Sequence, residues 1–144
     1  MRAQIPLFYA FISLFVFAGT SYADQSQIIG VYWFPDKEGQ VEIFEKDGEF
    51  SGKVVAYDIP DQLDEKNPDP KLRDQLFLGS LMLEGFTYKP KSKRWEGGTI
   101  YDAREGKVYK CRLWFDDKDN AVLKARGYIG TPMLGRTEKF ERVK

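Results

Sequence analysis

Short runs of apolar and aromatic residues recur along most of the chain, and clusters of glycine, proline, aspartate and asparagine separate them. Residues 107–116 alternate, because Tyr109, Cys111 and Leu113 fall on one face of an extended chain while mostly charged residues fall on the other. No stretch shows a long period of 3.6 residues, so we expect no major helix. The pattern predicts β-strands at residues 28–34, 41–44, 50–57, 78–83, 94–102, 107–116, 121–129 and 134–143.

The connections between these runs are short and carry turn signals. Asp47-Gly48 is a strong hairpin signal, and residues 35–39 and 104–106 also combine charged residues with glycine. Strands at this spacing are typical of a sandwich or an up-and-down barrel, and short connections favour pairing between neighbours in sequence. We therefore expect an all-β domain, a small antiparallel up-and-down β-barrel of about eight strands. Such a barrel is either filled by its own side chains or holds one small ligand.

Residues 59–77 interrupt this rhythm. Pro60, Pro68 and Pro70 prevent a continuous strand, so we expect a long loop over a mouth or an edge of the barrel. Such a loop is either a functional lid or a solvated connection. Its carboxylates lack the residue order of a calcium-binding loop, so we expect no metal there.

The first 23 residues follow a different pattern. Arg2 precedes an apolar run at residues 5–18, and Ser21 and Ala23 place small residues three and one positions before Asp24. This order predicts a signal peptide over residues 1–23, cleaved after Ala23, and a single domain over residues 24–144. The apolar run is shorter than the roughly 20 residues that span a bilayer, and no second run in the chain is long enough. We expect the mature chain to work outside the cytoplasm.

Charge and composition narrow the function. Without residues 1–23 the chain has 21 basic and 22 acidic residues, a formal charge of −1. Its Lys and Arg are interspersed with Asp and Glu, so we expect no basic face for nucleic acid or anionic lipid. The chain has no histidine, which excludes histidine-based nucleophile systems and disfavours a transition-metal site. Cys111 is the single cysteine and is predicted to be a buried, inert thiol.

Carboxylate chemistry is the one catalytic route that composition leaves open. Candidate carboxylates lie on or at the ends of predicted strands, but the sequence brings no two of them to a working separation. They are Asp58, Glu84, Glu96 and Asp102. We therefore expect a protein without a catalytic site, a metal or another cofactor.

Several motifs, in order, carry a resemblance to a known family. The main ones are Trp95-x-Gly97-Gly98-x-Ile100-Tyr101-Asp102, Gly106-Lys107-x-Tyr109, Arg126-Gly127-Tyr128-Ile129-Gly130 and Gly135-Arg136-Thr137, with Gly30-x-Tyr32, Gly52-Lys53-Val54, Lys66-Asn67-Pro68-Asp69, Gly79 and Gly85 before them. From about Ile29 to Val143 the chain resembles the exported bacterial proteins of the domain of unknown function 2147 family. The resemblance implies a small lipocalin-like (calycin) barrel in the cell envelope, here the periplasm, with no established activity. Two positions depart from the family pattern, which has proline at Ala103 and tryptophan at Phe140.

A lipocalin-like barrel closes one end with an aromatic ring under an arginine of the last strand, a cation–π contact. Gly30 begins the motif, and the ring is Tyr32 by position or Trp33 by residue type. Arg136 is the expected cation. This role is structural.

The ligand hypothesis centres on Arg126, Tyr101 and Tyr128. If Arg126 points inward, a fatty-acid-like carboxylate can pair with it, and the apolar tail would lie among Leu81, Leu83, Phe86, Tyr109 and Leu113. Strand alternation opposes this, because Leu123, Ala125 and Gly127 form the apolar set and leave Arg126 facing solvent, stacked on a neighbouring ring.

Two functions follow from these expectations. The first is a periplasmic barrel that binds a small hydrophobic or amphipathic ligand, such as a fatty acid, as a carrier or scavenger. The alternative is a non-enzymatic envelope interaction module with a filled core, in which exposed Trp114 and Trp33 meet an envelope protein or peptidoglycan. Neither function involves nucleic acid. A hollow interior favours the first, and a packed interior with an exposed aromatic patch favours the second.

Overall fold

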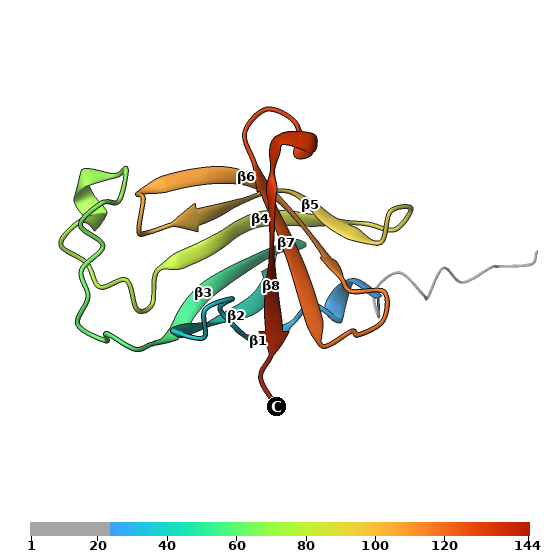
Figure 1. Cartoon of the computed structure of the whole chain (residues 1–144), viewed down its shortest axis with the longest axis horizontal. Helices are drawn as coiled ribbons and strands as arrows, with labels where there is room; N and C mark the ends of the chain where they lie inside the picture. Colours follow the sequence, from blue (N-terminus) through green and yellow to red (C-terminus); the bar gives the residue numbers. More distant parts are fainter. Residues whose placement is uncertain (1–23) are drawn as a thin grey trace, which may run out of the picture.

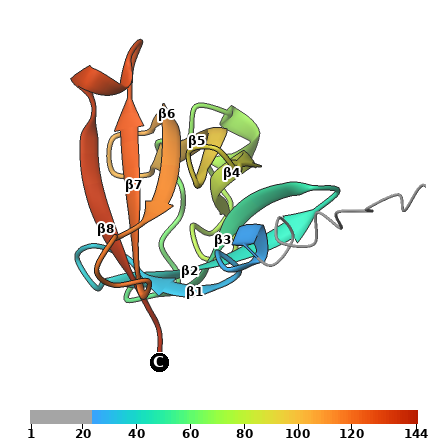
Figure 2. The ribbon, with the colours of Figure 1, turned by 90° about the vertical axis from the view of Figure 1, so that its right-hand side faces the viewer.

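A computed structural model describes residues 24–144, so the predicted signal peptide lies outside the described residues. Strands run antiparallel and each pairs with its neighbour in sequence. They are β1 (Gly30–Trp33), β2 (Gly39–Lys46), β3 (Glu49–Tyr57), β4 (Leu81–Lys89), β5 (Arg94–Asp102), β6 (Lys107–Phe115), β7 (Val122–Tyr128) and β8 (Arg136–Arg142), with 3-10 turns η1 (Pro70–Leu72) and η2 (Pro132–Leu134) (Figures 1 and 2). β8 returns to pair with β1 and closes the sheet into a barrel. The predicted lipocalin-like up-and-down barrel is therefore confirmed.

The strands lie close to their predicted positions, except β4. The sequence pattern ended this strand at Leu83, but it continues to Lys89. A bulge at Gly85, with a φ of 73°, lets the strand continue, because three residues of β4 pass two of β3 between Gly52↔Leu83 and Phe50↔Phe86. The bulge breaks the strict alternation of inward and outward residues. The sequence pattern therefore gave no signal for the second half of β4.

Gly98 on β5 is required by a close approach of the neighbouring strand β4. A Cβ atom at this position would lie 2.6 Å from the carbonyl oxygen of Glu84 and 2.6 Å from the ring of Phe86. The neighbouring strand can therefore press against β5 only where a side chain is missing, which allows the tight curvature of a small barrel.

The up-and-down topology gives the barrel two different ends. At one, here called the closed end, the segment 24–29 covers the barrel beside the turns after β2, β4 and β6 (Figure 1). The other, the mouth, is bounded by the connections after β1, β3, β5 and β7. Within residues 24–144 no helix is long and apolar enough to span a membrane.

Arg142 holds the closed end together. Its guanidinium carbon lies 4.7 Å from the centroid of the buried Tyr32 ring, and it donates hydrogen bonds to the carbonyl oxygens of Ile29 (3.0 Å) and Gln27 (2.5 Å). The Tyr32 hydroxyl donates to the carbonyl oxygen of Ile28 at 3.0 Å. Burial raises the pKa of Tyr32 to about 12, against the opposing effect of Arg142.

The expectation that Arg136 would be the closing cation is therefore wrong. Arg136 lies near the mouth, is 87% exposed at its side chain and forms an ion pair with Glu138. Arg136 and Arg142 are six residues apart on one strand, so alternation places both on the same face and does not separate them. The register Tyr32↔Arg142 decides between them. It also selects Tyr32 over Trp33 as the ring.

We predict that Arg142→Gln lowers the free energy of unfolding by about 2 kcal/mol, because a cation–π contact and two charge-assisted hydrogen bonds are lost. The matched variant Arg136→Gln removes an exposed arginine of the same strand and should change it by less than about 0.5 kcal/mol. Urea unfolding followed by tryptophan fluorescence measures both. Equal losses would show that Arg142 does not close the barrel.

Candidate functional site: a half-hollow barrel

The interior of the barrel is packed toward the closed end. Trp95 is buried there between Phe50, Tyr88 and Phe115, with ring centroids 6.4, 4.8 and 5.6 Å away. Its indole nitrogen donates to the carbonyl oxygen of Gln25 at 3.2 Å, which ties the N-terminal segment to the core. These large rings fill the space between the strands, so this half of the barrel has a solid core.

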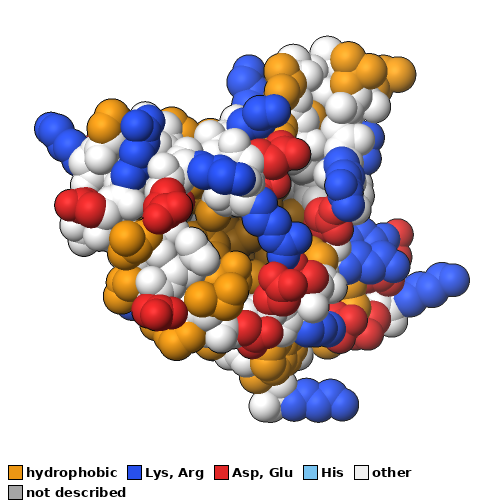
Figure 3. All heavy atoms as spheres, turned by 60° about the vertical axis from the view of Figure 1, so that its left-hand side comes forward, with side chains coloured by type: hydrophobic (Ala, Val, Ile, Leu, Met, Phe, Trp, Pro, Cys, Tyr) orange, Lys and Arg blue, Asp and Glu red, His pale blue; other side chains and the backbone are white. Residues whose placement is uncertain are grey.

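Toward the mouth the interior is hollow, with a cavity of about 690 Å³. Its inner wall is apolar or aromatic, and Ala125 and Gly127 on β7 carry little or no side chain, which leaves space. The wall residues include Phe34, Tyr57, Phe77, Met82, Ile100, Tyr109 and Phe140. On the face that shows the mouth, hydrophobic side chains form the floor of a hollow that charged side chains surround (Figure 3). A volume of this size lies within the roughly 300–1,000 Å³ of small-molecule sites.

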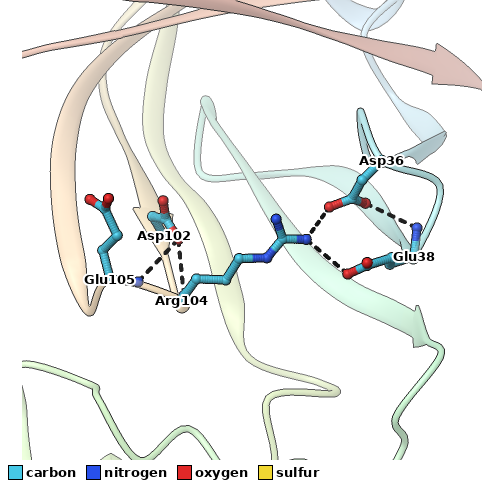
Figure 4. A network of polar contacts seen from close by, with 5 residues as sticks. All are labelled: Asp36, Glu38, Asp102, Arg104 and Glu105. Carbon is cyan, nitrogen blue, oxygen red and sulfur yellow. Dashed lines mark hydrogen bonds and ion pairs between the residues drawn. The ribbon is translucent and has the colours of Figure 1, made fainter.

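Arg104 crosses the mouth. It belongs to the turn after β5, and its Nη2 reaches the carboxylates of Asp36 and Glu38 in the connection after β1, the latter at 2.8 Å (Figure 4). These two connections stand on opposite sides of the closed barrel, because four strands separate them in either direction. The hydrogen bond to Asp36 and the charges of Asp36 and Glu38 raise the pKa of Arg104. We call these three residues the arginine bridge.

The charges around the cavity are predominantly acidic. Its lining includes four carboxylates and two guanidinium groups, which are Asp36, Asp102, Glu105, Glu138, Arg104 and Arg136. Both arginines are already paired, Arg104 in the arginine bridge and Arg136 with Glu138 at 2.6 Å. Within the described part of the chain, the cavity lining therefore offers a ligand carboxylate no cation free of an ion pair.

Loop 59–77 is fastened to the barrel beside the mouth. The buried Asp64 accepts hydrogen bonds from the Tyr101 hydroxyl (2.5 Å) and from Nδ2 of Asn67 (2.8 Å). Burial, followed by the hydrogen bond to Asp64, raises the pKa of Tyr101. Lys66 Nζ donates to the carbonyl oxygen of Arg104 at 2.6 Å. The loop is thus a fixed cover, rather than a freely solvated connection.

Gly106 permits this fastening. A Cβ atom there would lie 2.1 Å from the Lys66 carbonyl oxygen, and its φ of 66° already favours glycine. Phe77 at the end of the loop packs against Phe34 and Tyr57, with centroids 6.4 and 5.0 Å away, and forms part of the cavity wall. No group of three or more potential metal ligands occurs within residues 24–144.

Arg126 does not enter the cavity. Its Nε donates to the carbonyl oxygen of Pro132 (2.5 Å), Nη2 to that of Met133 (3.3 Å) and Nη1 to the Thr137 hydroxyl (2.8 Å). The outward orientation predicted by alternation is thus correct, and the hypothesis of an Arg126 anchor for a carboxylate is wrong. The guanidinium group holds the loop after β7 instead of stacking on a ring.

The other predicted site residues divide between the two halves. Tyr101, Tyr109 and Tyr128 line the cavity. Leu83, Phe86 and Leu113 are buried in the core but do not line the cavity, and Leu81 is 43% exposed. Phe34, Phe77 and Met82 were missed, because each lies in or beside an irregular connection or the bulged strand, where periodicity gives no signal for an inward side chain.

The remaining candidate residues are described by their burial and their contacts. Cys111 is fully buried, and burial raises the pKa of its thiol to about 12, in agreement with the predicted inert thiol. Arg94 and Arg112 lie over the Trp114 ring at 5.2 and 5.9 Å, and Trp114 and Trp33 are each partly buried. Of the four candidate carboxylates only Asp102 lines the cavity, where its Oδ1 accepts the backbone N–H groups of Arg104 and Glu105.

We predict that Tyr101→Phe loosens loop 59–77, because the buried Asp64 carboxylate loses a hydrogen-bond donor. The expected loss is about 1–3 kcal/mol in the free energy of unfolding, together with faster amide hydrogen exchange in the loop. Tyr109→Phe is the control, since that hydroxyl donates to the exposed Glu105 (2.8 Å). Unchanged exchange in Tyr101→Phe would contradict the assigned role of Asp64.

Comparisons with known proteins agree with this architecture. A solved structure described as "Protein HP1028 from the human pathogen Helicobacter pylori belongs to the lipocalin family" is similar with a TM-score of 0.69 and 25% sequence identity, covering 81% of this chain and 83% of that one. No curated protein matches the chain. Residues 30–142 match the family described as uncharacterized protein conserved in bacteria (DUF2147). This match includes all eight strands, so the chain belongs to the DUF2147 family.

Proposed function

We propose that the protein binds one small hydrophobic or amphipathic molecule inside the barrel, as an exported carrier or scavenger. The observation that carries this proposal is the apolar cavity of about 690 Å³ at the mouth of an otherwise packed barrel. When a ligand covers apolar surface that is open to water, the free energy falls in proportion to the apolar area removed from solvent.

The hollow interior favours binding over the alternative of a filled interaction module. That alternative required a packed core and an exposed aromatic patch. The half of the barrel near the mouth is not packed, and Trp114 is covered by Arg94 and Arg112. Both observations support a role for the interior.

The export part of the proposal rests on the sequence of residues 1–23. A positive start, an apolar run and small residues before Asp24 are typical of a cleaved secretory signal. Together with the membership of a family of bacterial proteins, this pattern supports the periplasm as the place of action.

The charge of the mouth selects the polar end of the ligand. Four carboxylates line the cavity against two arginines, and both arginines are already paired. The carboxylate of a ligand would therefore meet net repulsion without a cationic partner. A cationic head group, or a neutral one that hydrogen-bonds to tyrosine hydroxyls, fits better. We therefore propose a neutral or cationic amphiphile rather than a fatty acid.

Native mass spectrometry of protein purified from the periplasm without detergent should show a chain starting at Asp24 with one lipid-sized adduct that organic extraction releases. Gly127→Leu should abolish the adduct, because the introduced leucine side chain would point toward Ile100 and Tyr109 in the cavity wall and fill the cavity. Thr99→Leu on the outer face is the matched control. An apo mass that no hydrophobic compound shifts would refute the binding proposal and return weight to the interaction module.

A head-group series with one alkyl tail should bind in the order amine, alcohol, carboxylate at neutral pH. We expect the amine to bind at least about tenfold more tightly than the fatty acid, which corresponds to about 1.4 kcal/mol. Displacement of a fluorescent apolar probe measures the series, and raised salt should narrow the gap. A carboxylate that binds as tightly as the amine would contradict the proposed selectivity while leaving the cavity as the binding site.

A further inference from the structure

The loop after β7 carries the three most exposed large apolar side chains of residues 24–144. Met133 is 88% exposed, Leu134 82% and Ile129 71%, whereas the other exposed large apolar residues of the described chain lie between 39% and 53%. The β7–β8 hairpin stands beyond the neighbouring connections, with this loop at its outermost point (Figures 1 and 2). We call Ile129, Met133 and Leu134 the apolar tip.

The tip has a defined conformation. The three hydrogen bonds of Arg126 fix the carbonyl groups of Pro132 and Met133 and the side chain of Thr137. The backbone adds the η2 turn, in which Leu134 N–H donates to Thr131 (3.1 Å) and Gly135 N–H to Pro132 (3.2 Å). The loop therefore presents Met133 and Leu134 outward instead of folding them onto the barrel.

The outer face of β6, β7 and β8 beside the tip is basic. Its cations alternate with the buried residues Cys111, Leu113, Leu123, Ala125 and Phe140, and the register pairs Arg112 with Arg126 and Lys124 with Lys139. They are Lys110, Arg112, Lys124, Arg126 and Lys139. Two acidic residues belong to this face: Glu141 is paired with Lys37 at 2.7 Å, and Asp116, directly after β6, is paired with Lys124 at 2.8 Å. Five cations against two carboxylates leave the face basic. The expectation of no basic face is wrong here, because strand pairing gathers cations that are scattered in sequence.

We propose that the apolar tip enters the interface of an anionic lipid bilayer while the basic face lies against the head groups. A few apolar side chains on a projecting loop, flanked by cations, match the two contributions to interfacial binding, which are burial of apolar area and attraction to anionic lipid. Nucleic acid offers no apolar phase for Met133 and Leu134. Docking requires no ligand in the cavity, so the two proposals fail or succeed separately.

The position of the tip gives the docking a direction. Ile129 and Leu134 belong to the apolar tip and also line the cavity at the mouth. A bilayer that covers the tip therefore touches the β7–β8 side of the mouth. The docked molecule would take up or deliver an amphiphile without exposing its tail to bulk water.

Vesicle flotation tests the proposal with residues 24–144, which contain the complete barrel and its core. The apolar run at residues 5–18 is omitted because it would bind lipid by itself. The chain should float with vesicles of phosphatidylcholine and phosphatidylglycerol, and salt should weaken this binding. Met133→Ser with Leu134→Ser should reduce it by about fivefold or more, whereas the control pair Ile59→Ser with Leu72→Ser, exposed in loop 59–77, should not.

The basic face has its own control. Lys110→Gln with Lys139→Gln should reduce flotation with anionic vesicles, while Lys53→Gln with Lys89→Gln, exposed lysines on β3 and β4, should leave it unchanged. Failure of the wild-type chain to float, or flotation that the tip pair leaves intact, would overturn the proposal. Lysine-dependent binding of an oligonucleotide instead of vesicles would do the same.

A fluorescent label reports where the contact lies. Met133→Cys takes a polarity-sensitive dye, and Cys111 stays unlabelled because it is fully buried. Anionic vesicles should shift the dye emission to the blue at position 133 and leave it unchanged for a Leu72→Cys control in loop 59–77. A shift at both positions or at neither would refute insertion of the tip.

Discussion

The pairing of β1 with β8 is the contact on which the rest of the molecule depends. Two register pairs, Tyr32↔Arg142 and Trp33↔Glu141, join these strands, whereas eight join β2 to β3. One cysteine allows no intrachain disulfide, so this short seam closes the barrel without a covalent link. Arg142 reinforces it by binding the Tyr32 ring and two carbonyl groups of the N-terminal segment. Closure also leaves the sheet without a free edge, which protects it from pairing with other chains.

The division of the interior into a packed half and a hollow half follows from the size of the side chains. Phe50, Tyr88, Trp95 and Phe115 meet at the closed end, whereas Ala125 and Gly127 occupy the wall near the mouth. The aromatic half supplies the core that a small domain needs for stability. The hollow half can then remain open without weakening that core. One barrel thus separates a packed core from a cavity along its axis.

The parts of the structure that periodicity determines could be predicted from the sequence, and those that register determines could not. Alternation placed Cys111 inside and Arg126 outside, and turn signals located the hairpins. Alternation alone could not decide whether Arg136 or Arg142 closes the barrel, because both lie on the same face of β8. It also could not show that Lys110, Lys124 and Lys139 lie together on the outer face of the sheet. Phe34 and Phe77 lie in irregular connections, so their place in the cavity wall depends on tertiary contacts that no local pattern encodes.

The width of the mouth depends on the side chain of Arg104, which forms the arginine bridge. The strands around it are locked by ladder hydrogen bonds, and loop 59–77 is held by the buried Asp64. Arg104 is instead 65% exposed at its side chain, and exposed ion pairs contribute only about 0–1 kcal/mol. Rotation of its side chain takes picoseconds to nanoseconds, far less than the microseconds of a moving lid. The width of the mouth can thus change by rotation of the Arg104 side chain, while the surrounding strands keep their positions.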